Sequence, residues 1–375
     1  MRFSWRIIAV SFLGAPMACL SAPAANSGAQ SESGSTLVND VDPMASFARM
    51  EAGEWRLGSI QFDTWQWGPA RRSMRALTVG TDGQGNPWRE LVVYYWRPDR
   101  RRVCLLGFHP DIPGVGRGVA SGEIEFRGET ITTRFDLFQP RAPEGRPRRM
   151  GGRWVFDGPD KYHEALLEDN GAGLQPLAEW DYVRSMERSA GAATAEDRTL
   201  KPSKNLAAFE PLLGHWRARG KTALRGEFDI ESSFEWATYL DVITLRVMEA
   251  YQGGGSTHAL DAYVYHHVGS NSLRCLALSA SGAVYEGGVS VPEDGALQLN
   301  LTGCEADGKT EYLLRFDSES DGALRQRVWS VDGERRALAL DIRHRRVDSR
   351  RDESTQRRND APSQEDAAQR TPPGH

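Results

Sequence analysis

A Gly-x-Trp motif near the start of this chain of 375 residues recurs in its second half, and its repetition constrains the fold more than any other feature. The motif reads GEW at residues 53–55 and GHW at 214–216. A chain of this length, 39% hydrophobic and 26% charged, can form two ordinary domains with sizeable cores. The repeated motif therefore suggests that one domain is encoded twice.

Three more stretches match in the same order between the two halves. They are LVVYYWRPDRRRVCLL (91–106) with DAYVYHHVGSNSLRCLA (261–277), ITTRF (131–135) with LQLNL (297–301), and RWVFDG (153–158) with VWSVDG (328–333). In the first match a constant offset places Tyr94 on Tyr265 and Cys104 on Cys275. Ordered matches of this kind indicate an internal duplication with a period far longer than that of solenoid repeats.

The duplication predicts a domain organisation. We expect homologous domains at 44–185 and 205–348, joined by a polar linker at 186–204. Because the linker is polar and each domain has enough apolar residues for a core, we expect few contacts between the two domains.

Alternation of apolar and polar residues predicts β-strands in both halves. Residues 297–301 (LQLNL) and 338–342 (LALDI) alternate, as half-buried strands do. Asp-Gly pairs such as Asp157-Gly158 recur between such runs and are typical of tight hairpin turns. The sequence thus predicts an all-β fold with two tandem antiparallel β-barrels, each a meander of about nine or ten strands.

A short helix is expected at the entrance of each barrel. Asp42-Pro43 supplies an N-cap and a first-turn proline for the first helix, and Gly53 follows its end. Asn205 and Gly214 are expected to play the capping and terminating roles in the second helix.

These features together resemble bacterial lipocalin-like (calycin-type) β-barrel domains of unknown function. The likeness rests on the short helix, the Gly-x-Trp motif entering the first strand, the strand meander and a closing strand such as EWDYVR (179–184). It covers both copies of the domain. The resemblance implies that Trp55 and Trp216, with Gly53 and Gly214, are structural residues at the closed ends of the barrels.

The N-terminus is typical of a secretory signal peptide. Arg2 and Arg6 precede the apolar run 7–20, which ends before Ala22-Pro23-Ala24. We therefore expect residues 1–24 to be a signal peptide and the mature protein to be exported, periplasmic or secreted.

Other features bear on anchoring and order. Pro16 stands where a bacterial lipobox has leucine, which disfavours lipid attachment at Cys19. No apolar run beyond the signal is long enough for a transmembrane helix in the mature chain. Residues 25–43 form a segment expected to be disordered, and so does the charged tail 349–375.

Three cysteines remain in the mature chain, Cys104, Cys275 and Cys304. Export permits a disulfide, and Cys275 with Cys304 is the candidate pair. The alternative is a buried thiol, because Cys104 matches Cys275 in the repeat and has no partner in its own half.

The first domain carries an aromatic and basic set that the second lacks, and this set is the candidate ligand-binding site. It comprises Trp65, Trp67, Trp88, Tyr94, Trp96, Arg72 and Arg97. Aromatic side chains suit a small apolar or amphipathic molecule, and a guanidinium binds a carboxylate or phosphate. The alternative for the aromatic residues is core packing, and for the arginines solvated loop ends.

Three classes of function stay open. The first is an exported, non-catalytic protein that binds a small ligand in a barrel pocket, in domain 1 rather than domain 2. The second is a barrel-based enzyme with Glu235, His266 or His267 as acid or base. The third is an envelope or interaction protein with filled barrels. A deep apolar cavity favours the first class, convergent buried ionisable groups the second, and packed interiors the third.

Several other features are not expected. The sequence has no catalytic signature and no metal-ligand spacing, and it implies no cofactor. Nucleic-acid binding is not expected of an exported chain with net charge -5. The sequence leaves the oligomeric state open.

Overall fold

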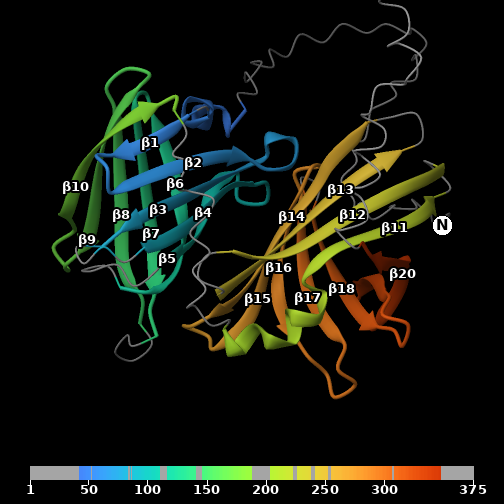
Figure 1. Ribbon diagram of the computed structural model, residues 1–375. Helices are drawn as coiled ribbons and strands as arrows, with labels where there is room; N and C mark the ends of the chain where they lie inside the picture. The colour runs from blue at the N-terminus through green and yellow to red at the C-terminus, as the bar shows by residue number, and fades with distance from the viewer. Residues whose placement is uncertain are drawn as a thin grey trace, which may run out of the picture.

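The computed structural model contains two closed, ten-stranded antiparallel β-barrels in tandem (Figure 1), as the sequence predicts. It describes residues 42–51, 53–82, 85, 87–109, 116–140, 146–187, 203–222, 226–237, 241–251, 255–305 and 308–347. The expected signal peptide with Cys19, the N-terminal segment up to residue 41, most of the linker and the charged tail lie outside the described residues.

Barrel 1 is a simple meander in which β1 pairs with β10 to close the sheet. Its strands are β1 (Glu54–Leu57), β2 (Gln61–Trp67), β3 (Ser73–Thr81), β4 (Pro87–Arg97), β5 (Arg102–His109), β6 (Gly118–Arg127), β7 (Thr130–Phe138), β8 (Arg148–Phe156), β9 (Lys161–Asp169) and β10 (Leu174–Ser185). Two short 3-10 helices accompany them, η1 (Ala45–Met50) and η2 (Pro69–Arg71).

Barrel 2 has the same connectivity, with β11 pairing with β20. Its strands are β11 (Gly214–Thr222), β12 (Gly226–Ala237), β13 (Val242–Tyr251), β14 (Ser256–His267), β15 (Ser272–Ser279), β16 (Val284–Ser290), β17 (Leu297–Glu305), β18 (Gly308–Ser318), β19 (Leu324–Asp332) and β20 (Arg335–Arg346). The 3-10 helix η4 (Lys204–Leu212) precedes them.

Local sequence accounts for most of these elements. In β17 the leucines at 297, 299 and 301 are buried in the core of barrel 2, and the polar residues between them are more exposed. Gly158 and Gly333 follow aspartates in the β8–β9 and β19–β20 turns at φ 79° and 58°. Glycine adopts this left-handed conformation without steric cost, so Asp-Gly ends one strand and begins the return.

The 3-10 helices η1 and η4 pack on Trp55 and Trp216, the tryptophans of the repeated Gly-x-Trp motif. Trp55 has no exposed surface, and its Nε1 donates a hydrogen bond to the carbonyl of Met50 in η1 at 3.3 Å. Trp216 repeats this arrangement, with Nε1 donating to the carbonyl of Leu212 in η4 at 2.6 Å. Arg184 and Arg346, near the ends of the two closing strands, place their guanidinium groups over the respective indole rings. Each barrel is therefore covered at one end by the same combination of helix, tryptophan and arginine.

The helix-start signals are wrong by one or two residues in both copies. The N-cap of η1 is Met44, without a side-chain hydrogen bond, so Pro43 precedes the helix; Asp42 Oδ1 accepts a hydrogen bond from the backbone N–H of Met44 at 3.0 Å in the turn before it. Asn205 lies inside η4, and Ser203 occupies the N-cap position without a side-chain hydrogen bond.

The repeat is real in architecture, but one sequence match is shifted by one residue. The β4–β5 hairpin closes with Arg97 opposite Arg102, and the β14–β15 hairpin closes with His267 opposite Ser272. Tyr95, and not Tyr94, is therefore equivalent to Tyr265. A shift of one residue moves a side chain to the other face of a strand, so Tyr94 lies inside its barrel while Tyr265 lies outside.

The match between RWVFDG and VWSVDG is also wrong. Residues 153–158 end β8, the eighth strand of barrel 1, whereas 328–333 end β19, the ninth strand of barrel 2. Both stretches are a strand followed by an Asp-Gly turn, a pattern that any hairpin of a meander can share.

The two barrels pack against each other, contrary to the expectation of few contacts. The outer faces of β4, β5 and β6 share a buried apolar cluster with residues of β13, β14, β15 and β16. This inter-barrel cluster comprises Leu91, Val93, Tyr95, Cys104, Leu106, Phe108, Val119, Val242, Tyr263, Tyr265, Leu276, Leu278 and Val284. The strands that form this contact have apolar side chains on both faces, because their outer faces are buried against the other barrel.

Polar contacts surround the inter-barrel cluster. The hydroxyl of Tyr95 donates to Glu286 Oε1 at 2.9 Å, and Arg97 forms an ion pair with the same carboxylate. Arg97 also donates from Nε to Asp99 at 2.9 Å, and Asp99 in turn lies 3.4 Å from Lys309 Nζ. Arg97 thus joins the barrels.

The cysteines are free and buried, so the candidate disulfide between Cys275 and Cys304 is wrong. Cys275 points into the core of barrel 2. Cys304 lies on the outer side of the wall, where its Sγ is 3.6 Å from Arg97 Nη2 of barrel 1. Two thiols on opposite faces of one sheet cannot form a bond. Cys104 belongs to the inter-barrel cluster, and burial raises its pKa to about 11.

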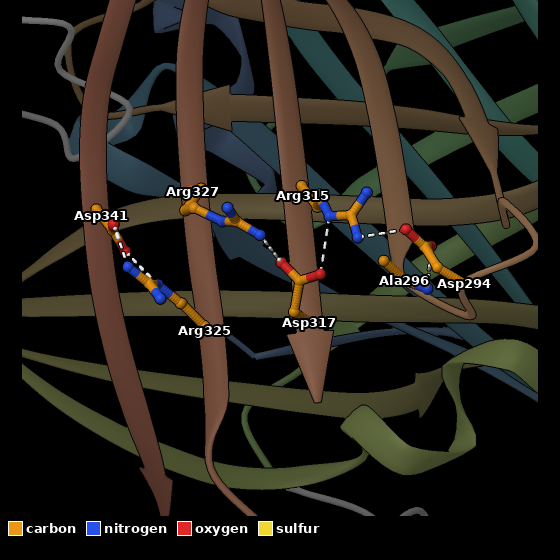
Figure 2. Close-up of polar contacts among 7 residues, drawn as sticks. All are labelled: Asp294, Ala296, Arg315, Asp317, Arg325, Arg327 and Asp341. Carbon is orange, nitrogen blue, oxygen red and sulfur yellow. Dashed lines mark hydrogen bonds and ion pairs between the residues drawn. The ribbon is translucent and has the colours of Figure 1, made fainter. Parts of the chain in front are cut away.

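The outer wall of barrel 2 carries a row of ion pairs across β18, β19 and β20 (Figure 2). Asp317 accepts hydrogen bonds from Arg315 at 2.8 Å and from Arg327 at 2.6 Å, and Arg325 binds both oxygens of Asp341. Neighbouring strands place opposite charges side by side here, which keeps this wall hydrated. None of the helices in the described part of the chain is long and apolar enough to cross a membrane.

Candidate functional site

A cleft of about 260 Å³ lies between the barrels, beside the inter-barrel cluster. Residues from both barrels and from η4 line it: Arg89, Phe108, His109, Arg117, Gly118, Val119, Pro140, Ser203, Asn205, Asp241, Val242, Tyr265, His266 and Val268. Phe108 and Tyr265 meet edge to face with ring centroids 5.1 Å apart and form part of an apolar floor. The volume approaches the roughly 300 Å³ at which typical ligand pockets begin, and pockets occur preferentially between domains.

Charged and polar groups surround this floor. Arg117 of barrel 1 forms an ion pair with Asp241 of barrel 2 across the cleft. His109 Nδ1 lies 3.3 Å from Glu90 Oε1. Burial alone lowers the pKa of His109, but the adjacent Glu90 carboxylate outweighs burial and raises it. His266 is held through Nε2 by Asn271 Oδ1 at 3.0 Å. The cleft therefore presents arginine and imidazole side chains beside an apolar surface.

The aromatic set predicted from the sequence does not line one pocket. Trp65 stacks on Tyr94 with ring centroids 5.4 Å apart, and Phe47 of η1 packs against both rings. Trp154 meets Trp65 and Tyr94 edge to face. These side chains fill the end of barrel 1 that η1 covers, which is the core-packing alternative.

The other three tryptophans are more exposed, and two of them, Trp67 and Trp96, are partly buried against this same core. The guanidinium of Arg71 lies over the Trp67 ring, with its carbon 4.3 Å from the ring centroid. Trp88 lies against Gly80, and Trp96 is partly buried at the far end of β4. Although Trp88 and Trp96 share a face, eight residues of strand separate them by about 26 Å. The aromatic side chains on this face of β4 are therefore spread too far along the strand to line one pocket.

The two predicted arginines also point elsewhere. Arg72 is exposed and lies beside Gly282 of barrel 2. Arg97 is engaged with Glu286 at the inter-barrel contact. Of the residues considered as acid or base, Glu235 is exposed on β12, His267 lies 4.6 Å from the ring of Phe138, and only His266 lines the cleft.

Barrel 1 holds a group of buried acids that the sequence analysis missed. Burial, followed by repulsion from Glu164, raises the pKa of Asp63 to about 8. Burial likewise raises the pKa of Glu164 to about 7, although Trp154 Nε1 donates to its carboxylate at 2.8 Å. Tyr162 donates to Asp63 Oδ2 at 3.3 Å, and Asp63 Oδ1 has no hydrogen-bond partner. The signal was visible in part, because these acids alternate with apolar residues on the inward faces of β2 and β9.

A smaller cavity of about 40 Å³ lies inside barrel 2. Its lining is apolar except for Ser232, Gln326 and His344. No motif or spacing in the sequence marks His344 as part of a site. In the described part of the chain, no three histidine, cysteine or acidic side chains lie together as metal ligands.

Comparisons with known proteins add little to this geometry. No family model and no curated protein matches the chain. Among solved structures, Rv2717c from M. tuberculosis is 19% identical, with a TM-score of 0.29 over 40% of this chain and 100% of that chain. A DUF3598-family protein of unknown function from Nostoc punctiforme is 12% identical, with a TM-score of 0.16 over 81% and 99% of the two chains.

A candidate outer membrane protein from Bacteroides fragilis is 10% identical, with a TM-score of 0.17 over 76% of this chain and 94% of that chain. Matches this weak carry no argument about function. The chain's own architecture defines its class, a protein of two tandem ten-stranded barrels. Lipocalins close with eight strands, so the resemblance to lipocalin-like domains extends to the meander and the covered end but not to the strand number.

Proposed function

We propose that this protein is an exported, non-catalytic binding protein whose ligand is a small amphipathic molecule held in the cleft between the barrels. The observation that carries the proposal is the cleft itself, in which an apolar floor from both barrels meets the guanidinium groups of Arg89 and Arg117 of barrel 1. Export rests on the signal-like residues 1–24. The lipocalin-like resemblance supports ligand binding only as an analogy of fold.

The lining suggests the chemistry of the ligand. Phe108, Val119, Val242 and Tyr265 offer a surface for an apolar body. Arg117 is about half exposed and already pairs with Asp241. A guanidinium has five N–H donors, so Arg117 has donors left for a second acceptor. We therefore place an anionic head group, a carboxylate or phosphate, beside Arg117 and an apolar tail on the floor.

This proposal moves the ligand away from the aromatic set of domain 1. Trp65 and Tyr94 are nearly fully buried against Phe47, and opening a pocket there would require η1 to leave. The cleft needs no such rearrangement. Domain 1 still contributes half of the proposed site through β4, β5 and β6.

An enzymatic function is the second candidate, and the buried acids of barrel 1 favour it. Asp63 and Glu164 have pKa values near 8 and 7, which is the range suited to a general acid or base at neutral pH. Glu90, which adds to the pKa rise of both acids, also contacts His109 in the cleft wall. Glu90 thus interacts both with these acids and with a residue of the cleft wall.

Calorimetric titration of the full chain with octanoate and with 1-octanol tests the binding proposal. We expect Arg117→Gln to weaken octanoate binding by about tenfold, the usual effect of losing one charged hydrogen bond, and to leave octanol binding unchanged. Arg102→Gln is the matched control, because Arg102 is an exposed arginine on β5 that pairs with Glu123. No octanoate binding, or equal binding by the Arg117 variant, would exclude the proposed site.

A further inference from the structure

The cavity inside barrel 2 is separate from the cleft and results from small side chains. Ala262, Cys275 and Ala277 face it from β14 and β15. By the hairpin register, Val92 and Leu105 of barrel 1 occupy the positions equivalent to Ala262 and Cys275. Barrel 2 therefore has the smaller side chain at these two inward positions, whereas Ala277 is equivalent to Gly107.

One residue that lines this cavity, His344, has a buried acceptor without a partner. His344 on β20 is 2% exposed, and its Nε2 lies 2.9 Å from the amide oxygen of Gln326. Because an amide oxygen only accepts, Nε2 carries the proton and donates it. Burial lowers the pKa of His344 to about 4, so the ring is neutral near pH 7. Nδ1 is then a bare acceptor, and it has no hydrogen-bond partner.

The remaining lining restricts what can satisfy this nitrogen. The cavity has no ionised residue in its wall, so a charged ligand would be desolvated without compensation. Its volume of about 40 Å³ accommodates roughly three water-sized groups. A chain of ordered waters would need two to four polar partners for each molecule, and only Ser232, Gln326 and His344 are polar here.

We propose that this cavity binds a small uncharged molecule with an apolar body and one hydroxyl group, which donates its hydrogen bond to Nδ1 of His344. The apolar body lies against the small and aliphatic side chains of β14, β15 and β17. The proposal does not depend on the cleft, and the two sites have no lining residue in common.

Ethanol and dimethyl ether test the proposal, because they have the same atoms and similar volume but only the alcohol has a donor. The ¹⁵N resonances of the His344 ring are followed in the full chain as each probe is added. We expect ethanol to move the Nδ1 resonance saturably and to bind about fivefold to tenfold more tightly than the ether. Equal affinities, or an Nδ1 resonance that neither probe moves, would overturn the proposal.

Substitution provides a second measurement. His344→Phe keeps an aromatic ring but removes the acceptor, so the preference for ethanol over the ether should disappear, as read by backbone amide shifts of residues around the cavity. His163→Phe is the control, because His163 lies on the outer face of barrel 1 and is 38% exposed. If His344→Phe does not fold, the alcohol and ether titrations of the unaltered chain still decide. An ethanol preference that persists in a folded His344 variant would overturn the assignment.

Discussion

Replacing Asp63 with asparagine tests whether barrel 1 keeps neutral carboxylic acids in its interior. Asp63 is 5% exposed and lies on β2 among the aromatic residues of the core. Asparagine has almost the same shape and keeps an oxygen that accepts the hydrogen bond from Tyr162. The variant therefore removes the ionisation of this residue with little change in packing.

The expected magnitude follows from the pKa of Asp63, which burial and then Glu164 raise from 3.8 to about 8. Below about pH 4 the carboxyl is protonated in both the native and the unfolded state, and the full stability is present. Between about pH 4 and pH 8 only the native state keeps the proton, so stability falls as pH rises. At about 1.4 kcal/mol for each pKa unit, the loss reaches about 4 kcal/mol at pH 7.

Urea unfolding of the unaltered chain and of Asp63→Asn from about pH 4 to pH 8 measures this effect. The variant should gain stability relative to the unaltered chain as pH rises, by several kcal/mol over the range. Asp317→Asn is the control: burial raises the pKa of Asp317, but hydrogen bonds from Arg327 and Arg315 outweigh burial and lower it. Asp317 is therefore ionised in both the native and the unfolded state above about pH 5, and its variant should show no gain in stability as pH rises. A stability difference for Asp63→Asn that stays constant over the pH range would refute the reasoning, since it would mean that Asp63 is ionised in the native barrel.

Three further predictions concern stability. Trp216→Ala should cost about 3 to 5 kcal/mol in urea unfolding, because Trp216 is 4% exposed and joins η4 to barrel 2; a loss below about 1 kcal/mol would indicate a surface role. The isolated segment 205–348 should unfold at a lower urea concentration than the same barrel in the full chain, since it exposes Tyr263, Tyr265 and their neighbours; an unchanged midpoint would contradict an energetic role for the inter-barrel cluster. Arg325→Ala should cost less than about 1 kcal/mol, as expected of an exposed ion pair, and a loss above about 2 kcal/mol would contradict this.

The sequence alone was sufficient for the architecture, because that information is local. Alternation such as LQLNL (297–301) sets which side chains a strand buries, and Asp-Gly turns such as Asp157-Gly158 determine where it returns. A meander of hairpins needs little else, so two barrels entered by short helices followed from the pattern. The burial of Trp55 and Trp216 was expected from the resemblance to lipocalin-like domains.

The candidate sites depended on contacts that no local pattern encodes. Of the cleft residues only His266 had been considered, because Phe108 and Tyr265 meet across more than one hundred and fifty residues of chain. Likewise, the sequence showed that His344 exists but not that it lines a cavity or that its buried Nδ1 has no hydrogen-bond partner.

What the sequence determined by itself was the strand period, the turns and the duplication. The tertiary structure decided which face of each wall is inside, because a shift of one residue between the repeats exchanges the two faces. Tyr94 and Tyr265 matched in sequence, yet one fills a barrel and the other lies between barrels. An apolar side chain gains from burial against any apolar surface, so only the docking of the two barrels determined which surface covered the outer residues of β4 and β14.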